Sequence, residues 1–402
     1  FMALGVQAEA LKFYVSAQTG NDSRNGTSWN AAFKTLKAAL KAAEANTNLE
    51  VNIYMAEGKY EVSDPVNHAS AFYVLTREGQ RLNIMGGFPK PGSRTLPTDT
   101  CNNNPKRYNT ELVASSKMTQ SIFRANNTNQ AIILRGLKFN SANFQGGVGQ
   151  GALITMDCNN CDNPYFEMDD CFISYYKSAG SGAIYFYGNM KNPRVKISRV
   201  EVLRGDFFGG VGGGFLAFSD LEKQTNTQLD LSYVTFHDIQ HQGTFQGQCL
   251  IGVTNAGTPE ENPKSYARLD HIQVNRNLGG TASAQMPTIS LEGFENVSIT
   301  NSVIHNTQAG DGGAIKIASF VNLLSENNQY YNNLGGDHGG AVYVVTGKQA
   351  KCGIDINRKR TAIFRNDQFY GNRSGVSLGK GDGGGLNIDS PDGDNPLSVQ
   401  IE

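Results

Sequence analysis

Three aspartates near the end of the chain stand at matching points of a glycine-rich pattern and are candidates for holding a metal ion. Asp311, Asp337 and Asp382 each precede a segment rich in glycine. If these segments lie on successive rungs about 4.8 Å apart, the three carboxylates form a column whose oxygens suit a hard cation such as Ca²⁺. The alternative is that Asp-Gly-Gly serves only as turn chemistry, and the sequence leaves both interpretations open.

Lys316, Asp337 and His338 are the candidate catalytic residues, because they combine a possible base with a carboxylate. A polysaccharide lyase needs a base that removes the proton next to a uronate carboxyl, and a cation that neutralises that carboxylate. A glycoside hydrolase instead needs two carboxyl groups roughly 5 to 9 Å apart. Aspartates on adjacent or next-adjacent rungs would have that separation.

The placement of these residues depends on a repeat that runs through most of the chain. Its first half is two pairs of apolar residues, spaced as in Ile132, Leu134, Leu137 and Phe139. This pattern begins at residues 132, 166, 195, 229, 267, 297, 323 and 362, so the step varies from 26 to 39 residues. A glycine-rich turn and one more apolar strand follow, as in Gly340-Ala341-Val342. A variable step around a fixed core indicates coils with inserted loops, and we predict a parallel β-helix with three short strands per coil.

The one clear helix precedes the repeat, and Ser28 or Asn30 can cap it. Its apolar residues recur at helical spacing; they are Phe33, Leu36, Leu40 and Ala43. Because a solenoid ends in unpaired backbone groups and an open apolar core, we expect this helix to cover the first coil. No comparable cap follows residues 382–402, so we expect the natural protein to continue beyond them.

Two groups of motifs resemble known β-helix proteins. The first resembles the N-terminal cap of secreted right-handed parallel β-helix proteins of the pectin-lyase-like superfamily; it comprises Phe13-Tyr14-Val15-Ser16, Gly20-Asn21-Asp22, Ala32-Phe33-Lys34-Thr35-Leu36 and Glu57-Gly58-Lys59-Tyr60. The second, the Gly-Gly-Ala strands together with Phe369-Tyr370-Gly371-Asn372, is similar to the repeats of polymorphic outer-membrane proteins. The resemblance implies an all-β, right-handed parallel β-helix over residues 11–402, with an N-terminal cap over 11–60, an amphipathic capping helix and clear repeats over 132–402.

The resemblance also implies that a saccharide would lie along the outward face of the strand that follows the glycine-rich turn. Alternation along that strand places Tyr185, Tyr187, Tyr343 and Asn387 outward, and these are the candidate substrate-binding residues. By the same alternation an apolar stripe faces outward on the early coils; it includes Ile154, Met156, Leu216 and Phe218. Such a stripe binds sugar faces or a partner, or is covered by long loops.

The first ten residues resemble the end of a secretory signal, with small residues at both positions that a signal peptidase reads in Ala8-Glu9-Ala10. The alternative is an ordinary apolar N-terminal strand. We expect a secreted protein, or one exposed on the outer-membrane surface.

In an oxidising compartment Cys158-x-x-Cys161 suits a small disulfide, and two free thiols or half a zinc site are the alternatives. Cys171 and Cys249 fall at core positions.

Composition excludes some partners. The chain of 402 residues has 35 Lys and Arg against 36 Asp and Glu, a net charge of −1, which gives no electrostatic case for nucleic acid. No apolar run is long enough for a membrane span. The resemblance to polymorphic outer-membrane repeats, together with the lack of a catalytic signature, implies a monomer that binds a polysaccharide or cell-surface glycan, adhesin-like and without a catalytic motif. The alternative is a polysaccharide lyase or glycoside hydrolase that acts on acidic polysaccharide at the outward face of the late coils.

Overall fold

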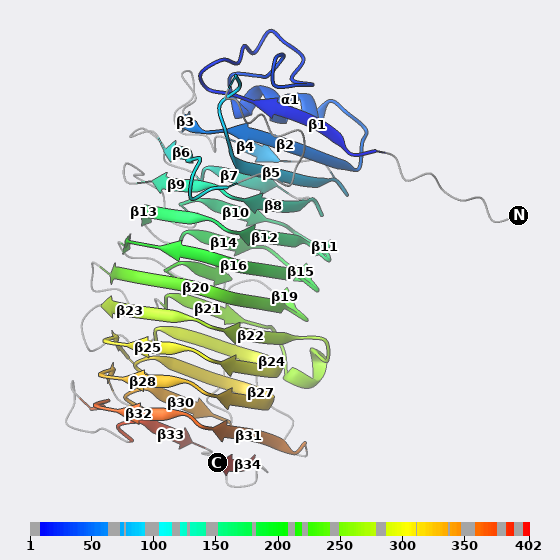
Figure 1. Ribbon diagram of the computed structural model, residues 1–402. Helices are drawn as coiled ribbons and strands as arrows, with labels where there is room; N and C mark the ends of the chain where they lie inside the picture. The colour runs from blue at the N-terminus through cyan, green and yellow to red at the C-terminus, as the bar shows by residue number, and fades with distance from the viewer. Residues whose placement is uncertain are drawn as a thin grey trace, which may run out of the picture.

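The structure, a computed structural model, is a long solenoid of stacked coils (Figure 1). It describes residues 9–62, 73–75, 78–92, 104–114, 121–126, 129–141, 152–178, 182–207, 214–218, 224–241, 249–278, 287–310, 312–336, 338–346, 358–375, 383–389 and 397–402. Within these residues, 31 strands form one sheet whose pairs are all parallel. The predicted all-β fold, a right-handed parallel β-helix, is confirmed. Residues 1–8 of the expected signal remnant lie outside the described part.

The strands stack into three faces. Face A contains β1 (Leu11–Val15), β2 (Glu50–Ala56), β5 (Arg81–Phe88), β8 (Ala131–Arg135), β12 (Tyr165–Asp169), the first parts of β16 (Arg194–Val202) and β20 (Gln228–His241), β22 (Tyr266–Asp270), the last parts of β24 (Ile289–Thr300) and β27 (Ile315–Glu326), β31 (Arg360–Arg365) and β34 (Leu397–Ile401). Face B contains β3 (Gly58–Val62), β6 (Thr110–Ala114), β9 (Lys138–Ser141), β13 (Phe172–Ser178), the last parts of β16 and β20, β17 (Gly205–Phe207), β23 (Gln273–Leu278), β25 (Val303–His305), β26 (Gln308–Ala309), β28 (Gln329–Tyr331), β29 (Leu334–Gly335) and β32 (Gln368–Tyr370).

Face C follows the glycine-rich turns. It contains β4 (Tyr73–Leu75), β7 (Phe123–Asn126), β10 (Ile154–Asp157), β14 (Ile184–Tyr187), β18 (Leu216–Phe218), β21 (Ile251–Thr254), the first parts of β24 and β27, β30 (Val342–Val345) and β33 (Leu386–Asp389). A separate sheet of β11 (Cys161–Asp162), β15 (Met190–Lys191) and β19 (Gln224–Thr225) lies at one corner of three coils. Cys158 and Cys161 form a disulfide beside it, whereas Cys171 and Cys249 are free and buried.

The core is a set of rows, because residues at equal positions on neighbouring coils pair in register. One row on face C comprises Phe123, Ile154, Ile184, Leu216, Ile251, Ile289, Ile315, Val342 and Leu386. All but the last are almost completely buried. The pairs of apolar residues recognised in the sequence point inward on faces A and B in the same way, so these strands are placed by the period of two that the sequence shows.

The register on face C corrects one prediction. On β10 and β18 the inward pairs are Ile154 with Met156 and Leu216 with Phe218, one residue later than the alternation predicts. The cause is the size of the residue at the turn. Leu153 and Phe215 are buried at the bend position that Ala183, Ala314 and Ala341 hold on other coils, so counting from the large apolar residue starts the strand one residue early. The predicted outward apolar stripe is therefore wrong, and its residues belong to the core.

The helix α1 (Leu36–Glu44) covers the first coil, as expected. Its N-cap is Thr35, whose hydroxyl accepts from the backbone of Ala38 at 3.2 Å, so the prediction of Ser28 or Asn30 is wrong. The chain before Thr35 pairs with β1 instead: the N–H of Phe33 donates to the carbonyl of Tyr14 at 2.9 Å. A second short helix, η1 (Pro259–Glu261), joins β21 to β22. Neither helix of the described chain is long and apolar enough to cross a membrane.

A column of left-handed residues makes the sharp bend between faces A and B. Its members all have φ between 50° and 61°; they are Gly136, Asp170, Arg199, Tyr233, His271, Asn301, Asn327 and Asn366. Glycine, aspartate and asparagine tolerate this conformation, which explains part of the Gly and Asn content. Arg199 and Tyr233 are bulky residues that rarely adopt it.

Inside the late coils, polar residues stack as a hydrogen-bonded ladder. Ser302, Asn328 and Asp367 occupy equal positions of the repeat, and each backbone N–H of the first two donates to the side-chain oxygen of the next, at 2.9 and 2.8 Å. The amide of Asn328 also donates to Asp367 at 3.0 Å. Thr307, Asn333 and Asn372 repeat the arrangement. These polar groups therefore pair with one another from coil to coil.

Replacing Asp367 by asparagine should stabilise the protein at neutral pH. Burial raises the pKa of the Asp367 carboxyl, so the charged form is disfavoured in the folded state. A carboxyl with a raised folded pKa contributes stability that is present below its unfolded pKa, about 4, and that is lost as the pH rises through the folded value. The asparagine side chain keeps the accepting oxygen without the charge. We expect the variant to gain on the order of 1 kcal/mol at pH 7 and to match the wild type near pH 3, measured by urea unfolding; an equal gain at both pH values would contradict this.

The capping role of α1 is tested by replacing Leu36, which is 1% exposed, with aspartate. An unpaired carboxylate would then lie against the end of the core, and the free energy of unfolding should fall by about 3 kcal/mol or more. Leu49, which is 73% exposed, gives the matched control: L49D should change the melting temperature little. Equal melting temperatures for L36D and the wild type would show that the helix is not a cap.

Candidate functional site

The outward row of face C on the late coils brings together three of the predicted residues. Lys316, Tyr343 and Asn387 are consecutive register partners on β27, β30 and β33. The Lys316 Nζ atom lies 5.4 Å from the centre of the Tyr343 ring, and the His338 ring stacks on Tyr343 with 5.0 Å between centroids. We call this group, with Asp389, the late-coil face. Its lysine and imidazole meet on one aromatic ring.

The Tyr343 side chain is buried and hydrogen-bonded, so it is not accessible to a ligand. It is 2% exposed, and its hydroxyl donates to Asp389 Oδ2 at 3.2 Å. It forms a small buried cluster with Ala318 and Val345 on the outer side of the sheet. A saccharide ring therefore cannot stack on Tyr343 in this arrangement, although Lys316 remains partly exposed beside it.

The three aspartates of the predicted metal column, Asp311, Asp337 and Asp382, all lie outside the described residues. The Ca²⁺ site and the catalytic role of Asp337 therefore stay predictions. Among the residues that the structure describes, no cluster of three or more His, Cys, Asp and Glu side chains is arranged to hold a metal ion.

Glu292 is a carboxylate that the candidate site omitted. It points outward from β24 in the row that continues through Ala318, Val345 and Asp389. Ser290, two residues earlier, is the register partner of Lys316, so Glu292 is a diagonal neighbour of that lysine. Only 8% of Glu292 is exposed. The signal in the sequence was a glutamate that follows Leu291 at an outward position of the strand alternation.

The early-coil tyrosines lie together on β14. Tyr185 and Tyr187 have ring centroids 6.2 Å apart. Tyr185 is 5% exposed and Tyr187 37%, so only the second offers surface to a ligand. Their outward direction is as predicted, and their role in binding stays a prediction.

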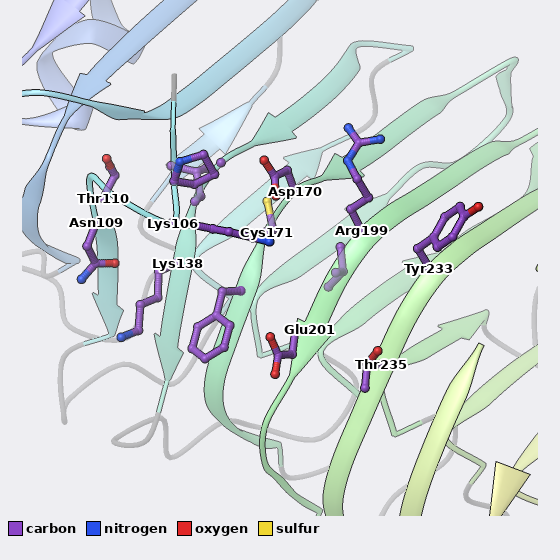
Figure 2. A pocket seen from close by; sticks show the side chains of 15 residues that line it. Lys106, Asn109, Thr110, Lys138, Asp170, Cys171, Arg199, Glu201, Tyr233 and Thr235 are labelled. Atoms are coloured by element: carbon purple, nitrogen blue, oxygen red, sulfur yellow. The ribbon is translucent and has the colours of Figure 1, made fainter. Parts of the chain in front are cut away.

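The structure also contains a groove that sequence reasoning did not locate. It has a volume of about 610 Å³ and follows the bend between faces A and B, across β6, β9, β13, β16 and β20. Figure 2 shows Asn109 and Thr110 at one end, Tyr233 at the other, and Asp170 with Cys171 between them. We call it the bend groove. Its walls come from segments more than a hundred residues apart in the chain.

Aromatic and charged side chains define the chemistry of the bend groove. The Tyr233 ring is 56% exposed and stacks on His271 of the following coil at 4.4 Å. Its other face therefore turns toward Arg199, on the preceding coil and in the groove wall. Nearby, Lys138 Nζ lies 5.4 Å from the Phe172 ring.

One ion pair and one carboxylate–imidazole contact lie at the groove. Arg199 is held by Asp169, whose other carboxylate oxygen accepts from Ser198 at 2.6 Å. Glu201 lies 3.7 Å from His237. The Cys171 thiol is a poor nucleophile, because burial raises its pKa to about 12 and keeps it protonated at physiological pH.

The bend groove coincides with the two unusual members of the left-handed column. Late coils carry Asn301, Asn327 and Asn366 at this bend, whereas the groove coils carry Arg199 and Tyr233. Bulky residues in this conformation store strain and are found at functional sites. Aligning the repeats shows Arg and Tyr at a bend position that otherwise holds Gly, Asp, His or Asn, and that is the sequence signal for the groove.

Comparison with known proteins does not assign the chain to a family. No protein-family model matches the chain, and no curated protein has significant sequence similarity to it. The functional argument therefore depends on the residues themselves.

Proposed function

We propose that the protein is a non-catalytic, adhesin-like β-helix protein that binds carbohydrate outside the cell. The observation that carries this is the bend groove, whose volume of about 610 Å³ is in the range of small-molecule sites. A half-exposed tyrosine ring beside side-chain amides, hydroxyls and charges matches what a sugar presents, which is an apolar ring face edged by hydroxyl groups. The ligand would be a polysaccharide or cell-surface glycan.

The wider proposal follows the resemblances in the sequence. It places the protein with secreted β-helix proteins of the pectin-lyase-like kind, with repeats like those of polymorphic outer-membrane proteins, as a monomer that is secreted or surface-exposed. The parallel β-helix with a helical N-terminal cap supports that placement. The protonated thiol of Cys171 supports binding rather than covalent catalysis in the groove.

Replacing Tyr233 by asparagine tests the groove. Asparagine suits the left-handed conformation better than tyrosine, so the variant should keep its melting temperature while glycan binding weakens by about tenfold or more. Tyr370, which is 49% exposed on face B away from the groove, is the matched control: Y370N should bind as the wild type does. Unchanged binding by Y233N on a glycan array and in calorimetry would exclude the groove as the binding site.

A second candidate is a polysaccharide lyase or glycoside hydrolase acting on acidic polysaccharide at the late-coil face. The contact of Lys316 and His338 with one Tyr343 ring, next to the buried Glu292, favours it. In this alternative Lys316 or His338 is the base, and Asp311, Asp337 and Asp382 hold Ca²⁺. Of the predicted substrate-binding residues, Asn387 and Tyr187 have surface that a substrate could contact, whereas Tyr343 and Tyr185 are buried.

Replacing Lys316 by alanine separates the two candidates. If the late-coil face is catalytic with Lys316 as its base, K316A should abolish turnover of acidic polysaccharide, because the variant lacks the amine that removes the proton next to the uronate carboxyl. Stability should change by less than about 1 kcal/mol, since a partly exposed lysine contributes little. Ultraviolet absorbance detects unsaturated lyase products, and reducing ends detect hydrolysis. No turnover by the wild-type protein would leave the binding function alone.

A further inference from the structure

The positive and negative charges that line the bend groove cancel one another. Arg199 is neutralised by Asp169. The remaining charged side chains in the lining are two cations, Lys106 and Lys138, and two anions, Asp170 and Glu201. Within the described chain, no ion pair joins Lys106 or Asp170 to another side chain. Two cations and two anions therefore face the same groove with no net charge between them.

From this balance we infer that the ligand of the bend groove is a neutral oligosaccharide, bound along the solenoid axis with one sugar ring against Tyr233. The inference rests on the proposed carbohydrate-binding function and names the class of glycan. It assigns the ligand to the bend between faces A and B, and not to the outward strands of face C.

Neutral sugars suit such a lining because each hydroxyl both donates and accepts a hydrogen bond. Lysines donate to hydroxyl oxygens and carboxylates accept from hydroxyl protons, and hydrogen bonds to charged groups are stronger than those between neutral groups. An acidic chain would gain from Lys106 and Lys138 but would be repelled by Asp170 and Glu201. The balanced groove therefore has no electrostatic preference for an acidic glycan.

The shape of the groove favours an extended chain. Its lining runs from β6 to β20 through β9, β13 and β16, which is four rung steps of about 4.8 Å each. A groove of that length, parallel to the solenoid axis, is longer than one sugar ring. The aromatic ring at one end fixes one sugar, and Asn109 with Thr110 marks the other end (Figure 2).

The strained bend gives independent support. Arg199 and Tyr233 hold φ values of 52° and 54°, where asparagine or glycine would be less strained. Tyr233 contributes the exposed ring, and Arg199, whose guanidinium is held by Asp169, lines the groove on the preceding coil. Both side chains thus lie where a sugar ring would be placed.

The experiment uses the full chain on an array of neutral and acidic glycans, followed by calorimetry with cellohexaose, laminarihexaose, mannohexaose and hexagalacturonate. We expect a neutral hexasaccharide to bind at least about tenfold more tightly than hexagalacturonate. Its affinity should be nearly the same at about 50 and about 500 mM salt, because no net charge is involved. Y233N should lose this binding, whereas Y370N, on face B away from the groove, should keep it.

Three results would overturn the inference, and they are distinguishable. Tighter binding of hexagalacturonate that weakens as salt is raised would show an acidic ligand, while the carbohydrate-binding function would stand. Neutral binding that K316A abolishes and Y233N retains would move the site to the late-coil face. Binding to no glycan on the array would overturn both the proposed function and the inference that rests on it.

Discussion

Each coil of this molecule is paired in register with the coils before and after it, and most other features depend on that constraint. Parallel strands repeat at about 4.8 Å, so a side chain at a given position touches the side chains at the same position on neighbouring coils. An apolar position must then be apolar in every coil to keep the core dry, which is what the row from Phe123 to Val342 shows. A polar position must find its partner in the adjacent coil.

The same constraint explains the ladders that hold the solenoid together. Asn328 accepts from one coil and donates to the next, and on face A Arg135 pairs with Glu167 at 2.8 Å. His305, Tyr331 and Tyr370 stack nearly parallel at 4.4 and 4.8 Å on face B. Because the inner rings of this stack cover one another, they offer edges rather than faces to solvent. This aromatic row is a stabilising ladder, in contrast to Tyr233, whose ring keeps one face toward a groove.

The two candidate sites differ in how far they depart from the ladder pattern. At the late-coil face, Lys316 and His338 pack on Tyr343, which is itself buried and hydrogen-bonded to Asp389. At the bend groove, side chains are exposed, and two bulky residues hold a left-handed conformation. Tyr233 stacks on His271 on one side only, and its ring stays 56% exposed at a strained bend. An exposed ring in that conformation is better explained by a ligand than by stability.

The sequence by itself determined the fold class, the inward faces of most strands and the position of the N-terminal cap, because these follow from local periodicity and from a repeat that can be read along the chain. It also placed Lys316, Tyr343 and Asn387 in one row, since equal offsets from a glycine-rich turn become neighbours in a solenoid. It could not determine the one-residue shift at Ile154 and Leu216. Leu153 and Phe215 hold a buried bend position that other coils fill with alanine, and only the pairing of the stacked coils shows that these two residues belong to the bend and not to the strand. Only the tertiary structure showed the bend groove, because Lys106, Arg199 and Tyr233 share a surface through coil stacking and not through any local pattern.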